Sequence, residues 1–198
     1  MITTSIFDYP VIAFRCEDSQ LYDRQDLKDK INDILDSDIV KQNCLPTTHF
    51  RGACETTVLL VDTIKVETFD EAIPLVNWVK ERILECRTAL DSSKKDVLLC
   101  QTFINRYHKG FEGASHDHHG MDGVAIFYLE ADEKGSDLVF LKESGHGRFP
   151  KEVADTDKLH FKVRSGDLVV HHPNHWHAIS EHRSDHARVC IIFDFQYI

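Results

Sequence analysis

Hydrophobic residues recur every three or four positions in two segments of the first half of the chain, residues 22–35 and 69–90. This is the period of a helix that buries one face, so both segments are predicted helices. Asp70 is the predicted N-cap of the second helix, and Pro74 falls about one turn inside it, where proline is tolerated. Between the helices, residues 56–64 are β-branched and apolar and predict a strand.

The second half of the chain changes to short runs of β-branched, aliphatic and aromatic residues. Five such runs alternate with segments rich in Gly, Ser, Asp and His, and they span residues 97–107, 124–129, 137–141, 168–172 and 189–195. A succession of short strands of this kind predicts an antiparallel sandwich or barrel. We therefore expect an α+β, mainly β protein with one domain over residues 1–198. Residues 1–96 would supply helical support and the first strands, and residues 97–198 the β core.

Composition and charge narrow the expected partners and location. The chain has 198 residues, of which 42% are hydrophobic and 28% charged, as in an ordinary globular protein. A formal net charge of -10 disfavours nucleic acid as a partner, because binding to phosphates requires clustered Lys and Arg. No run approaches the roughly 18 apolar residues of a membrane span, and the first residues lack the pattern of a signal peptide. We expect a cytoplasmic protein that is independent of membranes, with its six cysteines as free thiols.

Seven of the thirteen histidines lie in two short windows, residues 116–119 and 171–177. Histidine is the commonest metal ligand in proteins. On a strand, His116 and His118 would point to the same face because they are two residues apart. One histidine from a later strand would complete a set of three ligands, with open positions opposite them. Such open positions are what a catalytic metal needs.

His177 is the favoured third ligand. It precedes Ala178-Ile179, where the chain returns to the core, and His175 is the competing candidate. His171 and His172 follow an apolar strand and are interpreted as structural residues of that strand.

Arg188 opens an apolar run, where a buried guanidinium is costly unless it meets an anion. Its planar fork suits a carboxylate held by two contacts. The alternative is an ion pair with Asp185 or Glu181. Tyr128 lies in another apolar run, and its hydroxyl needs a hydrogen-bond partner, either a bound carboxylate or a backbone group.

These motifs together resemble the iron(II)/2-oxoglutarate-dependent oxygenases, whose catalytic domain is a double-stranded β-helix, a jelly-roll or cupin-like barrel. The resemblance covers residues 98–197, about half of the chain. Its motifs are Asn105-Arg106-Tyr107-His108-Lys109-Gly110, Phe127-Tyr128-Leu129-Glu130 with Gly135-Ser136-Asp137-Leu138-Val139-Phe140, and Gly166-Asp167-Leu168-Val169-Val170 through His177 to Arg188. The sequence is most similar to a bacterial and phage branch that carries H-x-H, within the prolyl-hydroxylase-like oxygenases.

The resemblance implies an enzyme that uses iron(II), 2-oxoglutarate and O2 and hydroxylates an unidentified substrate, with succinate and CO2 as co-products. It assigns the iron to His116, His118 and His177, and 2-oxoglutarate to Arg188, Tyr128, Tyr107 and Asn105. Most of the superfamily has H-x-D at the first motif, and here the carboxylate position holds His118. Asp117 could supply the carboxylate only if a β-bulge turned it inward.

Two other functions fit part of the pattern. Gly110-x5-His116-x-His118 fits the first half of a cupin motif, which suggests a three-histidine dioxygenase that needs no 2-oxoglutarate. The nearest acid to the glutamate expected in that motif is Asp122. The other function is a non-catalytic module that binds a metal or a ligand.

Overall fold

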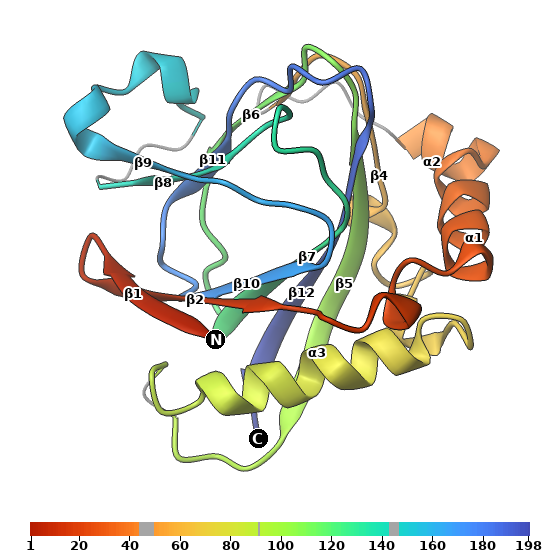
Figure 1. The fold of residues 1–198 in the computed structure, drawn as a ribbon, viewed down its shortest axis with the longest axis horizontal. Helices are drawn as coiled ribbons and strands as arrows, with labels where there is room; N and C mark the ends of the chain where they lie inside the picture. The colour runs from red at the N-terminus through yellow and green to blue at the C-terminus, as the bar shows by residue number, and fades with distance from the viewer. Residues whose placement is uncertain (44–49, 91, 143–146) are drawn as a thin grey trace.

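Two antiparallel sheets face each other in the computed structural model, which describes residues 1–43, 50–90, 92–142 and 147–198 (Figure 1). The larger sheet contains, in spatial order, β1 (Ile2–Ile6), β2 (Tyr9–Arg15), β10 (Asp167–His171), β7 (Gly123–Glu130), β12 (Arg188–Tyr197), β5 (Val97–Tyr107) and β4 (Cys54–Thr56). The smaller sheet contains β3 (Phe50–Arg51), β6 (Glu112–His116), β11 (His177–Ile179), β8 (Leu138–Leu141) and β9 (Lys158–Phe161). This confirms the expected jelly-roll arrangement of a double-stranded β-helix, although the described strands do not close into one barrel.

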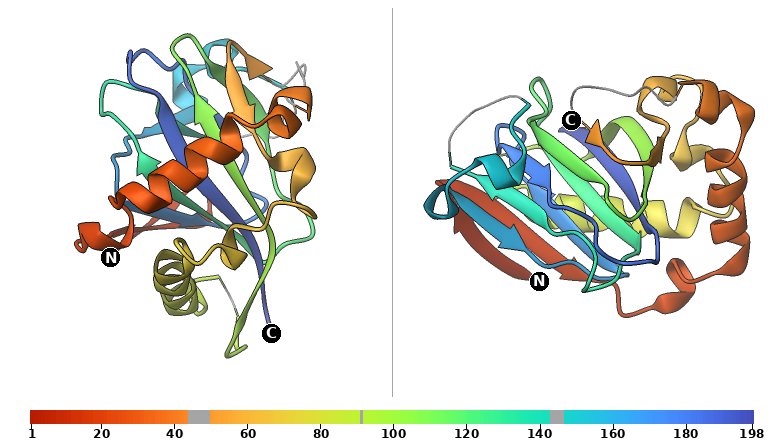
Figure 2. Two further views of the ribbon diagram at one scale, coloured as in Figure 1. Left: turned by 90° about the vertical axis from the view of Figure 1, so that its right-hand side faces the viewer. Right: turned by 90° about the horizontal axis from the view of Figure 1, so that it is seen from above.

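The helices support the larger sheet from outside (Figure 2). They are α1 (Gln25–Leu35), α2 (Asp38–Asn43) and α3 (Ile73–Cys86). The apolar stripes of α1 and α3 share a buried cluster with the outward residues of the sheet, such as Phe127 on β7. Side chains at alternate positions of the same strand, such as Ile126, point instead into the space between the sheets. No helix in the described part of the chain has the length and apolar character needed to cross a membrane.

The second predicted helix is shorter than the hydrophobic pattern suggested. It begins at Ile73, and its N-cap is Ala72, which makes no side-chain capping bond, so the prediction of Asp70 as N-cap was wrong. Pro74 is the second residue of the helix, where its missing N–H group would have had no intrahelical partner.

The strand predicted over residues 56–64 was also wrong. Strand β4 ends at Thr56, and a 3₁₀ helix follows at Val58–Leu60. Between them, the Thr57 hydroxyl accepts the N–H of Ile104 at 2.9 Å. A side chain thus takes the hydrogen bond that would otherwise continue the ladder with β5.

The N-terminal hairpin of β1 and β2 was not predicted. Its turn residues, Phe7 and Asp8, have positive φ angles of 47° and 73° and lack the Asn-Gly or Asp-Gly signature of such turns. The hairpin forms one edge of the larger sheet, so the first half of the chain supplies strands as well as helices (Figure 1). In contrast, the predicted run 97–107 coincides with β5.

The cysteines in the described part of the chain, at positions 16, 54, 86, 100 and 190, form no disulfides. Cys44 lies outside the described residues. Burial raises the pKa of Cys86 to about 12, so that thiol stays protonated.

Candidate functional site

His116, His118 and His177 lie together at one cavity between the sheets. One ring nitrogen of each lies within 4.8 Å of those of the others, close enough to surround a single ion. His116 ends β6, His177 begins β11, and the two residues are register partners. His118 lies beyond the end of β6, and its backbone N–H donates to the carbonyl of Pro173 at 3.0 Å. The strand alternation expected for the first pair therefore ends at His116, and a turn held by Pro173 places His118.

In each of the three rings the Nδ1 atom lies near an oxygen of the protein. The Nδ1 atoms lie close to oxygen acceptors: His116 to the Ala114 carbonyl at 3.2 Å, His177 to the His175 carbonyl at 3.0 Å, and His118 to the Asp194 Oδ1 at 2.8 Å. Because a carbonyl can only accept, the neutral rings of His116 and His177 carry their proton on Nδ1. The Asp194 Oδ1 lies at ion-pair distance from His118 but makes no hydrogen bond of regular geometry with the described residues. With Nδ1 turned to the protein, Nε2 is the atom of such a ring that can bind a metal.

His177 is fully enclosed by the protein. Burial, together with the neighbouring histidines 116, 171 and 118, lowers its pKa well below the usual range. Its ring is neutral near pH 7, which is the form that binds a metal.

The carboxylate of Asp117 does not belong to this group. Its side chain is 3% exposed, and its Oδ2 lies 2.9 Å from Nε2 of the exposed His119. The pairing of β6 with β11 is irregular between Gly113 and His116, but the strand ends at His116 and this irregularity does not bring Asp117 into the group. Asp122, the acid nearest to the cupin pattern, accepts the backbone N–H of Tyr197 at 2.8 Å.

The other histidines of the second window also lie outside the group. The ring of His175 packs on Phe140, with their centroids 4.3 Å apart, and His172 stacks on Tyr9 at 4.6 Å. His171 is buried on β10 beside the ring of His177.

Arg188 is a buried cation without an acidic partner. It is 2% exposed, and its guanidinium donates to the backbone carbonyl and the hydroxyl of Ser136, at 3.1 and 2.8 Å. No carboxylate of the described residues forms an ion pair with it, and its Nε has no hydrogen-bond partner there. The alternative ion pairs were wrong, because Asp185 pairs with Lys109 and Glu181 with Arg183.

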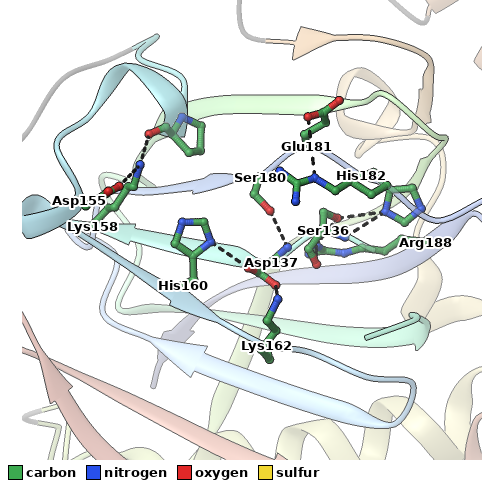
Figure 3. A network of polar contacts seen from close by, with 12 residues as sticks. Ser136, Asp137, Asp155, Lys158, His160, Lys162, Ser180, Glu181, His182 and Arg188 are labelled. Carbon is green, nitrogen blue, oxygen red and sulfur yellow. Dashed lines mark hydrogen bonds and ion pairs between the residues drawn. The ribbon is translucent and has the colours of Figure 1, made fainter. Parts of the chain in front are cut away.

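Ser136 and His182 hold this arginine, and neither was predicted as a site residue (Figure 3). The Nδ1 of His182 accepts the Ser136 N–H at 3.2 Å, and its Nε2 lies 2.7 Å from the carbonyl of His186. Burial is the main cause that lowers the pKa of His182, so the ring is neutral near pH 7. Ser136 lies in the motif quoted above, but no periodicity marks its role, and His182 lies in a loop without any pattern.

Two tyrosines flank Arg188. The guanidinium carbon lies 4.7 Å from the ring centre of Tyr128 and 5.5 Å from that of Tyr107. The Tyr128 hydroxyl is buried and has no hydrogen-bond partner among the described residues. Burial raises the pKa of both tyrosines well above the usual value, so both hydroxyls keep their protons.

Asn105 orients the second tyrosine. Its Nδ2 donates to the Tyr107 hydroxyl at 2.7 Å, and its Oδ1 accepts from the Thr56 hydroxyl at 2.5 Å. Since the Tyr107 oxygen already accepts a bond, its own proton is free to be donated to another group.

The cavity brings these groups together with the exception of Tyr128, which is not among the residues described as lining it. It has a volume of about 330 Å³, and the three histidines, Arg188, Tyr107 and Asn105 line it. Two paired strands build one wall, because alternate residues share a face. The register partners on that face are Arg188 with Tyr107, Cys190 with Asn105, Ile192 with Phe103 and Asp194 with Gln101.

The sequence also matches a known protein family. Residues 101–194 match the family described as "Putative 2OG-Fe(II) oxygenase". This range contains every residue that the sequence analysis assigned to iron or to 2-oxoglutarate. The predicted resemblance to iron(II)/2-oxoglutarate oxygenases is thereby confirmed. No curated protein matches the chain.

Solved structures share the fold. A prolyl-4-hydroxylase from Pseudomonas putida aligns with a TM-score of 0.61 at 13% identity, covering 95% of this chain and 92% of that one. SnoN, a non-heme alpha ketoglutarate dependent epimerase from nogalamycin biosynthesis, aligns with a TM-score of 0.63 at 11% identity, covering 94% and 77%. HygX from Streptomyces hygroscopicus, with nickel, 2-oxoglutarate and hygromycin B bound, aligns with a TM-score of 0.52 at 11% identity, covering 96% and 82%.

Proposed function

We infer that this chain is a 2OG-Fe(II) oxygenase, the family that residues 101–194 match, and we propose that it hydroxylates a substrate in the cavity between its sheets. The proposed metal ligands are the Nε2 atoms of His116, His118 and His177. The proposed 2-oxoglutarate site consists of Arg188, Tyr128, Tyr107 and Asn105.

The observation that carries this proposal is the uncompensated charge of Arg188. A buried guanidinium without a carboxylate costs several kcal/mol, and a bound carboxylate would offset that cost. Arg188 lines the same cavity as the three histidines, whose ring nitrogens lie within 4.8 Å of one another. A dicarboxylate whose keto-acid end chelates a metal and whose other end meets an arginine fits both features at once.

The residues of the proposed site have separate roles. Arg188 binds the distal carboxylate, held in place by the two oxygens of Ser136. The Tyr128 and Tyr107 hydroxyls, which stay protonated, donate to the cosubstrate. Apolar side chains such as Ile126 and Ile192 line the cavity and limit the access of water. Iron(II) on the three histidines would supply the activation of O2, with 2-oxoglutarate as the co-reductant.

Two further features support smaller proposals. Strands from both halves of the chain take part in both sheets, which supports one domain over residues 1–198. Cysteines that form no disulfides in the described part of the chain suit the reducing conditions of the cytoplasm, which we propose as the location.

The test is turnover of 2-oxoglutarate. We expect the iron(II) protein to convert 2-oxoglutarate to succinate under air, and to develop a charge-transfer band when 2-oxoglutarate is added without O2. Absence of both signals in a metal-loaded, folded protein would overturn the assignment.

Arg188→Lys keeps the charge but not the two-point geometry, and should raise the KM for 2-oxoglutarate. Arg183→Ala is the matched control, since that side chain is 77% exposed and pairs with Glu181. It should behave like the wild type. An equal effect of both substitutions, or none, would argue against the proposed carboxylate site.

The all-histidine ligand set also supports a second candidate, a cupin-like dioxygenase that needs no cosubstrate. In that case O2 uptake would proceed without 2-oxoglutarate, and Arg188→Lys would not change it. A protein that binds iron but consumes neither O2 nor 2-oxoglutarate would be a non-catalytic metal-binding module.

A further inference from the structure

One of the three histidines contacts a carboxylate, whereas the other two contact backbone carbonyls. The Nδ1 of His118 lies 2.8 Å from Oδ1 of Asp194, at ion-pair distance, and the two side chains are 9% and 6% exposed. This oxygen makes no hydrogen bond of regular geometry with the described residues. Asp194 lies on β12, on the same face as Arg188 and six residues after it. It is the only acidic residue among those described as lining the cavity.

The carboxylate of Asp194 is not neutralised by a basic side chain. Within the described residues it forms no ion pair with a lysine or arginine, and the ring of His118 lies 2.8 Å from it. A buried carboxylate is costly unless a positive charge lies nearby. One ring nitrogen of His118 lies within 4.8 Å of ring nitrogens of His116 and His177, and with Nδ1 beside Asp194 the proposed ligand atom is Nε2. A cation bound at Nε2 would provide the missing positive charge through the ring.

We propose that Asp194 is a positioning residue of the metal centre, a step that rests on the proposed function of His118 as a ligand. It holds the His118 ring with Nε2 toward the metal. It also supplies a negative charge behind the ligand His118. In H-x-D oxygenases a carboxylate places that charge on the metal itself. A carboxylate that accepts the Nδ1 proton makes the opposite nitrogen a stronger ligand.

Metal binding tests this role without any need for turnover. Metal-free protein is titrated with Co(II) in the absence of 2-oxoglutarate, and binding is followed by the visible absorption of Co(II). We expect Asp194→Ala to weaken Co(II) binding about 10- to 100-fold, the range for loss of a carboxylate behind a histidine ligand. Asp194→Asn keeps an acceptor for the Nδ1 proton but loses the charge, so its loss should be smaller and the Co(II) absorption should shift.

Asp117→Asn is the matched control. Asp117 is the other buried carboxylate beside His118 in the chain, and it pairs with His119 instead. Its replacement should leave the affinity and the spectrum of Co(II) unchanged. Thermal unfolding of the metal-free variants shows whether each is folded, and if Asp194→Ala is not, Asp194→Asn decides the test.

Two results would overturn the proposal. One is Co(II) binding by folded Asp194→Asn with the affinity and spectrum of the wild type. The other is an equal or larger loss in Asp117→Asn. Since this assay requires neither O2 nor 2-oxoglutarate, a dependence on Asp194 without succinate formation would refute the oxygenase and leave the role of Asp194 standing. Succinate formation together with Co(II) binding that does not depend on Asp194 would refute the role of Asp194 and leave the oxygenase standing.

Discussion

His116 and His177 are register partners on the neighbouring antiparallel strands β6 and β11, and their ring centres lie 4.4 Å apart. The hydrogen-bonded ladder thus sets the distance between two of the three proposed ligands, although one comes from each histidine window. The third, His118, depends on a turn, so its position relies on contacts outside the ladder.

The first prediction concerns the metal itself. His118→Ala removes a proposed ligand and should strongly reduce the iron(II) retained per protein, measured by metal analysis of protein without a histidine tag. His119→Ala, one residue further on, should retain iron like the wild type because its side chain is 71% exposed and points to Asp117. Equal retention by both variants would contradict the assignment of His118.

The second prediction concerns the support of Arg188. Ser136→Ala removes the hydroxyl that accepts from the guanidinium at 2.8 Å but keeps the backbone carbonyl. Loss of one hydrogen bond to a charged group, about 1.5 kcal/mol or more, should raise the KM for 2-oxoglutarate roughly tenfold with a smaller effect on kcat. Ser180→Ala is the control, because that hydroxyl accepts from the backbone of Asp137 and not from Arg188 (Figure 3). A change in kcat alone would place Ser136 elsewhere in the reaction.

The third prediction separates binding from stability. The Tyr128 hydroxyl is buried without a partner, so Tyr128→Phe should leave the free energy of unfolding unchanged or raise it by about 1 kcal/mol, while weakening 2-oxoglutarate binding. Tyr197→Phe should lower the free energy of unfolding and leave 2-oxoglutarate binding unchanged, because that hydroxyl donates to the Ile83 carbonyl at 2.8 Å in the cluster between the larger sheet and the helices. Urea denaturation and 2-oxoglutarate titration of both variants provide the comparison. A clear loss of stability in Tyr128→Phe would mean that its hydroxyl has a structural partner.

The fourth prediction concerns pH. The pKa of His182 is lower in the folded protein than the usual value of about 6.5, chiefly because of burial. Above pH 6.5 the ring is neutral in both states, so its contribution to stability is complete there. As the pH falls below 6.5, the unfolded chain binds a proton that the folded protein does not. The free energy of unfolding should then fall, by at most about 1.4 kcal/mol per pH unit for this one proton.

Urea denaturation of metal-free protein between pH 5 and 8 measures this effect. Histidines 171, 175 and 177 add pH dependence of the same sign, since burial lowers the pKa of each. The difference between the wild type and His182→Gln isolates the contribution of His182, and the variant should show the shallower slope. Parallel slopes would mean that His182 titrates normally in the folded state.

Elements with a strong hydrophobic pattern could be predicted from the sequence. Elements whose bounds depend on contacts with other strands could not. Strand β5 matched its predicted bounds because eleven consecutive residues suit a pleated, half-buried surface. The hairpin within residues 2–15 could not be predicted, because its turn residues Phe7 and Asp8 carry no turn signature. They adopt positive φ angles under the constraint of the surrounding sheet. The ladder of β4 stops where Thr57 bonds to Ile104, a contact that local pattern does not encode.

The sequence by itself determined the chemistry of this protein: two histidine windows, an arginine at the start of a buried strand, and the family that this order of motifs resembles. These are local features, readable from spacing and from the cost of burying a charge. Only the tertiary structure decided which groups meet. It turned Asp117 toward His119 and set Asp194 behind His118, and it placed Ser136 and His182 behind Arg188. The physical reason is that such pairs join residues from separate strands and loops, so their contacts exist only once the two sheets have packed.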